Sequence, residues 1–312
     1  MSDKTIKKLH QAVRDDIGDL LTQRPLPNDH LAQLDPFLFL NHHGPQVYPP
    51  HNHGLPFGPH PHRGFETVTF ILDGMLTHQD SAGHESIIRA GGVQWMTAGS
   101  GIVHAEVSPQ EFLREGGPIE LLQLWVNLPG RLKMSPPAYT GLQADQIPAV
   151  AAGSGATLHL IAGQWQDNGG STSGSTSEPV SGPTSGPLSR PIRGPISGPI
   201  DSLTGVFMST IDLPAGAEIR LDGLLARTVF LYVVRGAVTI AGQRVAGYTL
   251  VELNDEGDAV DLLAEEDSLV VFGHAQAIGE PVVSHGPFVM NTRQEINQAI
   301  TDYQAGRFGA PR

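Results

Sequence analysis

The chain of 312 residues consists of short apolar segments separated by glycine- and proline-rich turns. Residues 65–72 are rich in β-branched and aromatic types, and Asp73-Gly74 follows them as a hairpin signal. Residues 228–240 read as two more strands joined at Arg235-Gly236. Similar short strands are expected at 92–97, 120–126, 206–213 and 268–272. This regular spacing predicts an all-β protein with a sandwich or barrel in each half.

Helical structure is expected only at the end of the chain. The 37 glycines and 25 prolines argue against a helical bundle, because both residues are poor helix formers. Apolar residues recur at helical spacing only over 292–303, and Thr292 and Glu295 match a capping box at the start of that segment. We therefore expect one short C-terminal helix.

A segment of biased composition divides the chain. Six prolines recur every fourth residue from Pro179 to Pro199, after a stretch of glycine, serine and threonine. Such a sequence cannot bury an apolar face. We expect a first domain over 1–168, a linker or flexible insertion over 169–201, and a second domain over 202–312. The repeats could alternatively be a ligand for a proline-binding module.

Charge and composition exclude several functions. The net charge is −13, and neither half has a basic face suited to binding nucleic acid directly. The chain has no cysteine, which excludes disulfides, thiolate zinc sites and cysteine nucleophiles. No apolar run is long enough for a signal peptide or a membrane span. We expect a soluble cytoplasmic protein without a membrane partner.

Histidine is concentrated in the first half, where nine of the 14 histidines lie between residues 42 and 104. His60-Pro61-His62 precedes the strand at 65–72, and residues two apart on extended backbone point to the same side. His104-Ala105-Glu106 is a second pair of this kind. The Gly99-Ser100-Gly101 turn before it can bring its strand beside the first. The two pairs predict a site of three histidines and one carboxylate.

This ligand set suits iron(II), manganese, nickel or copper, with positions left open for water or substrate. A structural zinc site is usually closed by four ligands, often thiolates. An H-x-H pair alone is weak evidence, but the joint occurrence of both pairs in a glycine-rich β context favours a metal site. The candidate ligands of one divalent metal ion are His60, His62, His104 and Glu106.

The residues around these pairs resemble the pirin family, a branch of the cupin superfamily. Residues 60–69 resemble its first metal motif and 94–106 its second, while 123–128 and 286–292 match two further segments. The resemblance implies two cupin barrels (jelly-roll, or double-stranded β-helix) in one chain, with the final helix packed on the first barrel. It also implies a metal, usually iron, on the four candidate ligands.

Pirin-family proteins are similar to quercetin 2,3-dioxygenases, so the resemblance implies an oxidoreductase that opens flavonols with O₂ and releases carbon monoxide. Its partners would be a small aromatic, flavonol-like substrate and O₂. Its cofactor would be Fe(II), with Mn, Ni, Co, Cu or Zn as alternatives. Glu106 would also be catalytic, accepting the flavonol hydroxyl proton. The alternative is a non-catalytic metal-binding regulator that acts through contacts with a protein partner.

Three residues are candidates for orienting ligands or lining the approach to them: Glu66 on the strand at 65–72, and His42 and His43 before the first pair. His78 and His84 flank a glycine-containing turn and are expected at the surface.

The second half has no H-x-H or H-x-E pair. Aligning Gly236 with Gly74 places Asp222 and Leu224 at the positions of His60 and His62. We therefore expect the second barrel to bind no metal.

Overall fold

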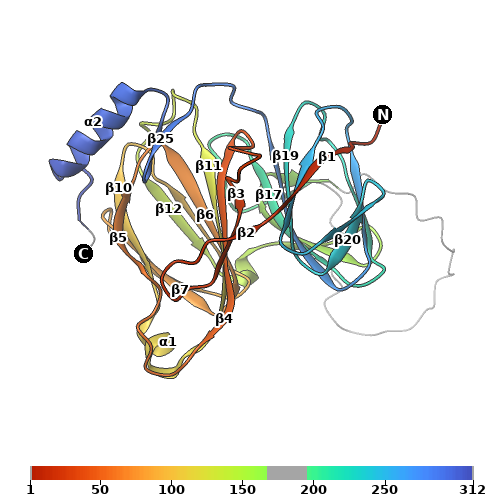
Figure 1. Cartoon of the computed structure of the whole chain (residues 1–312), viewed down its shortest axis with the longest axis horizontal. Helices are drawn as coiled ribbons and strands as arrows, with labels where there is room; N and C mark the ends of the chain where they lie inside the picture. Colours follow the sequence, from red (N-terminus) through yellow and green to blue (C-terminus); the bar gives the residue numbers. More distant parts are fainter. Residues whose placement is uncertain (1, 167–194, 311–312) are drawn as a thin grey trace, which may run out of the picture.

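The computed structural model describes residues 2–166 and 195–310 (Figure 1). These residues form two β-barrels side by side, each built from a seven-stranded and a four-stranded sheet. The all-β fold with two barrels predicted from the strand spacing is confirmed. None of the helices in these described ranges is long and apolar enough to cross a bilayer.

The first barrel carries most of the histidines. Its strands are β2 (Val13–Arg14), β3 (Thr22–Leu26), β4 (Phe37–Tyr48), β5 (Phe57–His62), β6 (Phe65–Asp73), β7 (Met75–Asp80), β8 (Glu85–Arg89), β9 (Val93–Thr97), β10 (Ile102–Val107), β11 (Gly117–Asn127) and β12 (Ala138–Leu142). The large sheet has the order β12-β9-β6-β11-β4-β3-β2, and the small sheet has the order β5-β10-β7-β8. Two short helices, α1 (Gln110–Glu115) and the 3-10 helix η1 (Ala144–Gln146), lie between strands. The predicted hairpin forms at Gly74, whose φ is 79°.

The second barrel repeats this topology. Its strands are β1 (Ile6–Gln11), β13 (Ala149–Ala152), β14 (Ala156–Ala162), β17 (Phe207–Leu213), β18 (Glu218–Leu221), β19 (Thr228–Arg235), β20 (Ala237–Ile240), β21 (Gln243–Ala246), β22 (Thr249–Leu253), β23 (Val260–Ala264) and β24 (Ser268–Ala275). The large sheet has the order β1-β22-β19-β24-β17-β14-β13, and the small sheet has the order β18-β23-β20-β21. The two strands predicted over 228–240 are β19 and β20, joined at Gly236, whose φ is 81°.

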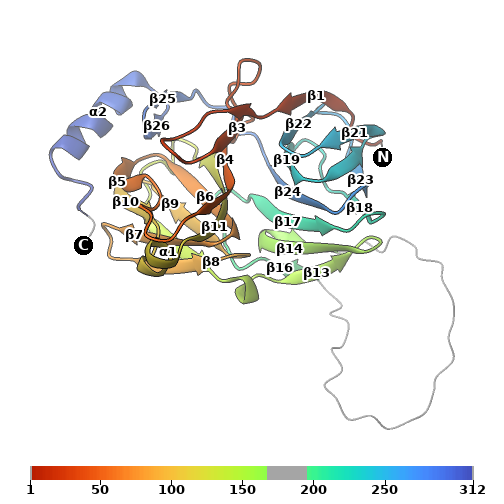
Figure 2. The ribbon, with the colours of Figure 1, turned by 60° about the horizontal axis from the view of Figure 1, so that its bottom comes forward.

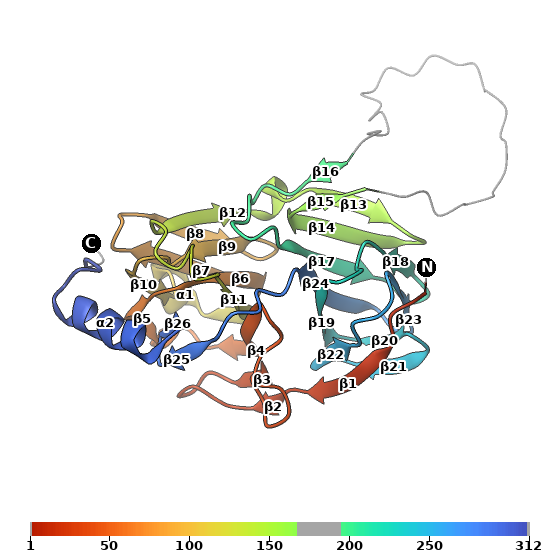
Figure 3. The ribbon, with the colours of Figure 1, turned by 90° about the horizontal axis from the view of Figure 1, so that it is seen from above.

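The residues that form each barrel do not follow the domain limits expected at 168 and 202. Strands β1, β13 and β14 belong to the large sheet of the second barrel (Figure 3). Strand β15 (Gln164–Trp165) pairs with β16 (Ile196–Ser197) in a separate two-stranded sheet. The shift in composition does not separate the two large sheets, because β14 before it and β17 after it are neighbours in one sheet. Residues 167–194, with most of the proline repeat, lie outside the described residues.

The two large sheets pack against each other through one face. Val68 and Trp95 of the first barrel share an apolar cluster with Phe230 and Tyr232 of the second. Because alternate residues of a strand face opposite sides, the other face of β6 and β11 lines the interior of the first barrel. That interior is where the histidine-bearing strands β5 and β10 lie opposite the large sheet.

The end of the chain returns to the first barrel (Figure 2). Helix α2 (Arg293–Gln304) begins with the predicted capping box, in which Thr292 and Glu295 bond each other's backbone N–H. Strands β25 (Val283–His285) and β26 (Phe288–Met290) form a hairpin before it. Ile296 and Ala299 of α2 pack with Val103 of β10, as expected for a helix that docks on the first barrel.

Candidate metal centre

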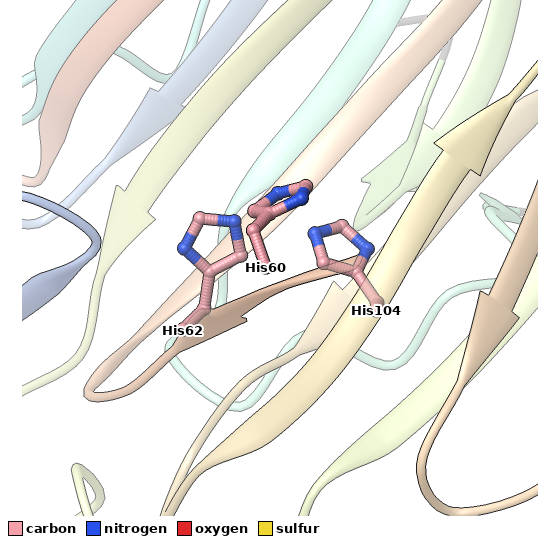
Figure 4. Close-up of side chains that lie close together, drawn as sticks. All are labelled: His60, His62 and His104. Carbon is pink, nitrogen blue, oxygen red and sulfur yellow. The ribbon is translucent and has the colours of Figure 1, made fainter. Parts of the chain in front are cut away.

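Three histidines converge inside the first barrel (Figure 4). His60 and His62 lie on β5 and His104 on the neighbouring antiparallel strand β10, directly opposite His60. One ligand nitrogen from each lies within 4.8 Å of those of the other two. The ring centroids of His60 and His104 are 4.4 Å apart, and those of His62 and His104 are 4.9 Å apart. The predicted adjacency of the two motif strands is therefore confirmed.

Burial keeps two of these imidazoles neutral. His62 and His104 are almost fully buried, and burial lowers the pKa of His62 to about 3 and the pKa of His104 well below its usual range. A neutral imidazole has a free lone pair on one nitrogen, which is the form that binds metal ions.

The hydrogen bonds of His60 and His62 involve only one ring nitrogen of each residue. The Nδ1 atoms of His60 and His62 bond the backbone oxygens of Gly58 (2.8 Å) and Pro287 (3.3 Å). Donation from Nδ1 leaves the Nε2 lone pair available. His62 Nε2 and both nitrogens of His104 are buried without a partner among the described residues. Since buried polar atoms are normally bonded, the unpaired nitrogens of His62 and His104, together with the convergent His60, fit a divalent metal ion.

Glu106 lies two residues after His104 on β10 and is also buried. Its Oε1 accepts a hydrogen bond from Thr69 Oγ1 (2.9 Å), and its Oε2 accepts one from Gln123 Nε2 (2.5 Å). It is not part of the group whose ligand atoms all lie within 4.8 Å of one another. Its participation as a ligand therefore stays a prediction.

The turn after His62 is tied to the turn before His104. Arg63 donates from Nε to the backbone oxygen of Ser100 (2.7 Å) and from Nη1 to Asp302 of α2 (2.8 Å). Gly64 follows with φ of 89°, and a Cβ there would collide with the backbone oxygen of Val289. The C-terminal segment thus holds together the two segments that carry the histidines.

Glu66 lies on the face of β6 opposite to the histidines. It is directly opposite Thr97 on β9, whose hydroxyl donates to Glu66 Oε1 (2.7 Å), while Oε2 has no partner among the described residues. Burial raises the pKa of this carboxyl. Its neighbour Phe65 contacts the ring of His62 at 5.0 Å, and adjacent residues of a strand point to opposite faces. The expectation that Glu66 orients a metal ligand is therefore corrected.

His42 and His43 are buried on β4, and the ring of His43 lies 5.2 Å from that of Phe57 on β5, the strand that carries His60 and His62. A supporting role for His43 beside the ligands stays a prediction. His42 bonds Tyr232 of the second barrel (3.0 Å) and Glu120 (3.0 Å), so it connects the two barrels. His43 bonds the hydroxyl of Thr22 (2.8 Å). Neither belongs to the group of convergent ligand nitrogens. Their adjacent positions on one strand send them to opposite faces.

His78 is buried, so the expectation of a surface position was wrong for this residue. It lies opposite Glu106 across the β7–β10 ladder, and its ring stacks on Tyr139 at 3.8 Å. Its Nε2 bonds the buried Asp80 (3.0 Å). The alternation of β7 could have revealed this placement, because His78 and Asp80 are two residues apart and share a face.

Comparison with known proteins supports these observations. The family models described as pirin and as the pirin C-terminal cupin domain match residues 19–126 and 208–309. A pirin-like protein from Caulobacter vibrioides is 39% identical over 96% of each chain. A crystal structure of quercetin 2,3-dioxygenase from Acinetobacter baumannii is 33% identical, with 99% of each chain covered and a TM-score of 0.83.

A crystal structure of a bacterial pirin from Escherichia coli in complex with nickel(II) shares the fold. Its TM-score is 0.61 at 19% identity, over 86% of this chain and 99% of that one. The family models, together with the identity to the Caulobacter protein over nearly the whole length of both chains, show that the chain belongs to the pirin family.

Proposed function

We propose that the protein is a metal-dependent dioxygenase that opens flavonols such as quercetin with O₂ and releases carbon monoxide. The observation that carries this proposal is the convergence of three histidines inside the first barrel, two of which, His62 and His104, have buried nitrogens without a partner among the described residues. The likeness to the Acinetobacter quercetin 2,3-dioxygenase over nearly the whole length of both chains supports the same reaction class.

His60, His62 and His104 would hold one divalent metal ion, with Glu106 as the fourth ligand. A bound Fe(II) would supply a Lewis acid with coordination positions open to the flavonol and O₂. The nickel(II) in the Escherichia coli relative makes nickel the second metal to load. The buried, neutral imidazoles of His62 and His104 need not lose a proton to bind either metal.

Glu106 would accept the proton of the flavonol hydroxyl on a carboxylate oxygen. An ionised carboxylate has about four acceptor positions, and Thr69 and Gln123 each occupy one. The carboxylate can therefore take up a proton without losing both of these contacts. His60 is only partly buried, so the substrate would reach the site on the side of β5.

The test is to load the protein anaerobically with Fe(II), add quercetin and admit air. Loss of the flavonol absorbance together with carbon monoxide release is expected, and His104→Ala loaded in the same way should show neither. No turnover with any of Fe, Mn, Ni or Co would contradict the proposal. Stoichiometric metal binding in such a protein would favour the non-catalytic regulator.

A further inference from the structure

A hydrogen-bond network reaches Glu106 from the opposite sheet of the first barrel. Glu106 lies on β10 of the small sheet, whereas its donors Thr69 and Gln123 lie on β6 and β11 of the large sheet. Thr69 and Gln123 are directly opposite each other across the β6–β11 ladder. Thr69 and Gln123 therefore bind both carboxylate oxygens of Glu106 from the opposite side of the barrel interior.

Trp125 determines which end of the Gln123 amide faces Glu106. An indole N–H can only donate, and Trp125 Nε1 donates to Gln123 Oε1 at 3.3 Å. The amide nitrogen is thereby directed toward the carboxylate. Trp125 lies two residues after Gln123, on the same face of β11, and its ring meets that of His62 edge-on at 5.4 Å. Gln123 and Trp125 thus contact two of the four candidate ligands, Glu106 on β10 and His62 on β5.

We propose that Gln123 is a positioning residue that fixes the Glu106 carboxylate, and that Trp125 sets the orientation of the Gln123 amide. This inference rests on the proposed function only in taking Glu106 as a metal ligand. Two donors fix the direction of the carboxylate while each oxygen retains a lone pair for a cation. Hydrogen-bond partners of metal ligands typically change metal affinity or activity about 10–100-fold.

Isosteric variants separate positioning from packing. Gln123→Met retains the length of the side chain but cannot donate, and Thr69→Val retains its shape but lacks the hydroxyl. Thr69→Ser keeps the hydroxyl that donates to Glu106. Gln94→Met is the matched control, because Gln94 lies beside Thr69 across the β6–β9 ladder but donates to the backbone oxygen of Leu76 (3.2 Å).

The experiment is a nickel(II) titration of the full-length metal-free chain by calorimetry, with the melting temperature of each metal-free variant measured alongside. Gln123→Met and Thr69→Val are expected to weaken nickel binding about 10-fold or more. Thr69→Ser and Gln94→Met should bind like the wild type. Trp125→Phe, which keeps a ring but frees the amide to flip, should show a smaller loss than Gln123→Met.

If Glu106→Gln binds nickel more weakly than the wild type, wild-type nickel affinity in both Gln123→Met and Thr69→Val would overturn the proposal. Unchanged affinity in Glu106→Gln would overturn the ligand assignment and this proposal together. Because the titration contains no flavonol, its result is independent of dioxygenase activity. An inactive protein whose nickel affinity depends on Gln123 would therefore support the positioning role and contradict only the proposed reaction.

Discussion

Each barrel contains an equivalent pair of neighbouring strands in its small sheet, but only the pair in the first barrel carries candidate metal ligands. Strands β5 and β10 of the first barrel occupy the places that β18 and β23 occupy in the second. In the first barrel the cross-strand pair is His60 and His104, whereas Ile219 and Leu262 form a buried pair in the second. The second barrel therefore fills with apolar side chains the region that the first fills with imidazoles.

This difference shows that the candidate metal site depends on a few side chains placed on a shared fold. The apolar side chains of the second barrel stabilise it by their burial, at roughly 25 cal/mol per Å² of apolar surface. The first barrel instead buries imidazole nitrogens that have no partner within the described protein. An unsatisfied buried polar group costs about 1–3 kcal/mol, so a bound metal would stabilise only this barrel.

The largest expected effect is loss of metal from the first barrel. His60→Ala and Glu106→Ala should lower the metal content, measured by elemental analysis, from stoichiometric to near background. His274→Ala, which removes a half-buried histidine that stacks on Phe207 in the second barrel at 4.9 Å, should retain the metal. Equal metal content in all three variants would contradict a metal site in the first barrel.

A smaller effect is expected on thermal stability. A metal at 100 times its dissociation constant should stabilise the wild type by about 2.7 kcal/mol. His104→Leu should show no such gain. Its metal-free form should be at least as stable as metal-free wild type, because the variant removes two unpaired buried nitrogens. A metal-dependent rise in the melting temperature of His104→Leu would place the metal elsewhere.

The smallest difference between the barrels should appear in acid. Burial lowers the pKa of His43 in the first barrel and of His274 in the second to about 3. The unfolded chain binds a proton at each near pH 6.5, so stability is lost as pH falls from about 6.5 toward 3. Both barrels should therefore respond to acid in the same direction.

His43→Gln tests this acid response. It should reduce the loss between pH 7 and 4.5 by about 2–3 kcal/mol, measured by urea denaturation of metal-free protein. Since Gln does not titrate in this range, the same loss as in wild type would show that His43 is not buried in its neutral form.

Local sequence patterns predicted several turns, one helix start and the pairing of two ligands well. The turn glycines Gly74 and Gly236 and the cap at Thr292 act within a few residues, so their signals are readable in the sequence. The i, i+2 spacing of His60 and His62 predicted convergence because strand alternation needs only two residues to be visible.

Pairing between strands that are distant in the sequence has no local pattern of this kind. Strand β1 pairs with β22, more than 200 residues away, and no local pattern identifies this partner. A single offset from Gly74 to Gly236 aligned Asp222 and Leu224 with the histidines, whereas the strand order aligns β18 with β5. The bond from His42 to Tyr232 likewise depends on how two large sheets pack. These features follow from the tertiary fold.

Anomalous X-ray diffraction from crystals of the metal-loaded full chain tests the central claim most directly. We predict a single strong peak inside the first barrel, about 2.0–2.2 Å from nitrogens of His60, His62 and His104, and none between β18 and β23. A stoichiometrically loaded protein whose peak lies away from these three histidines would contradict it.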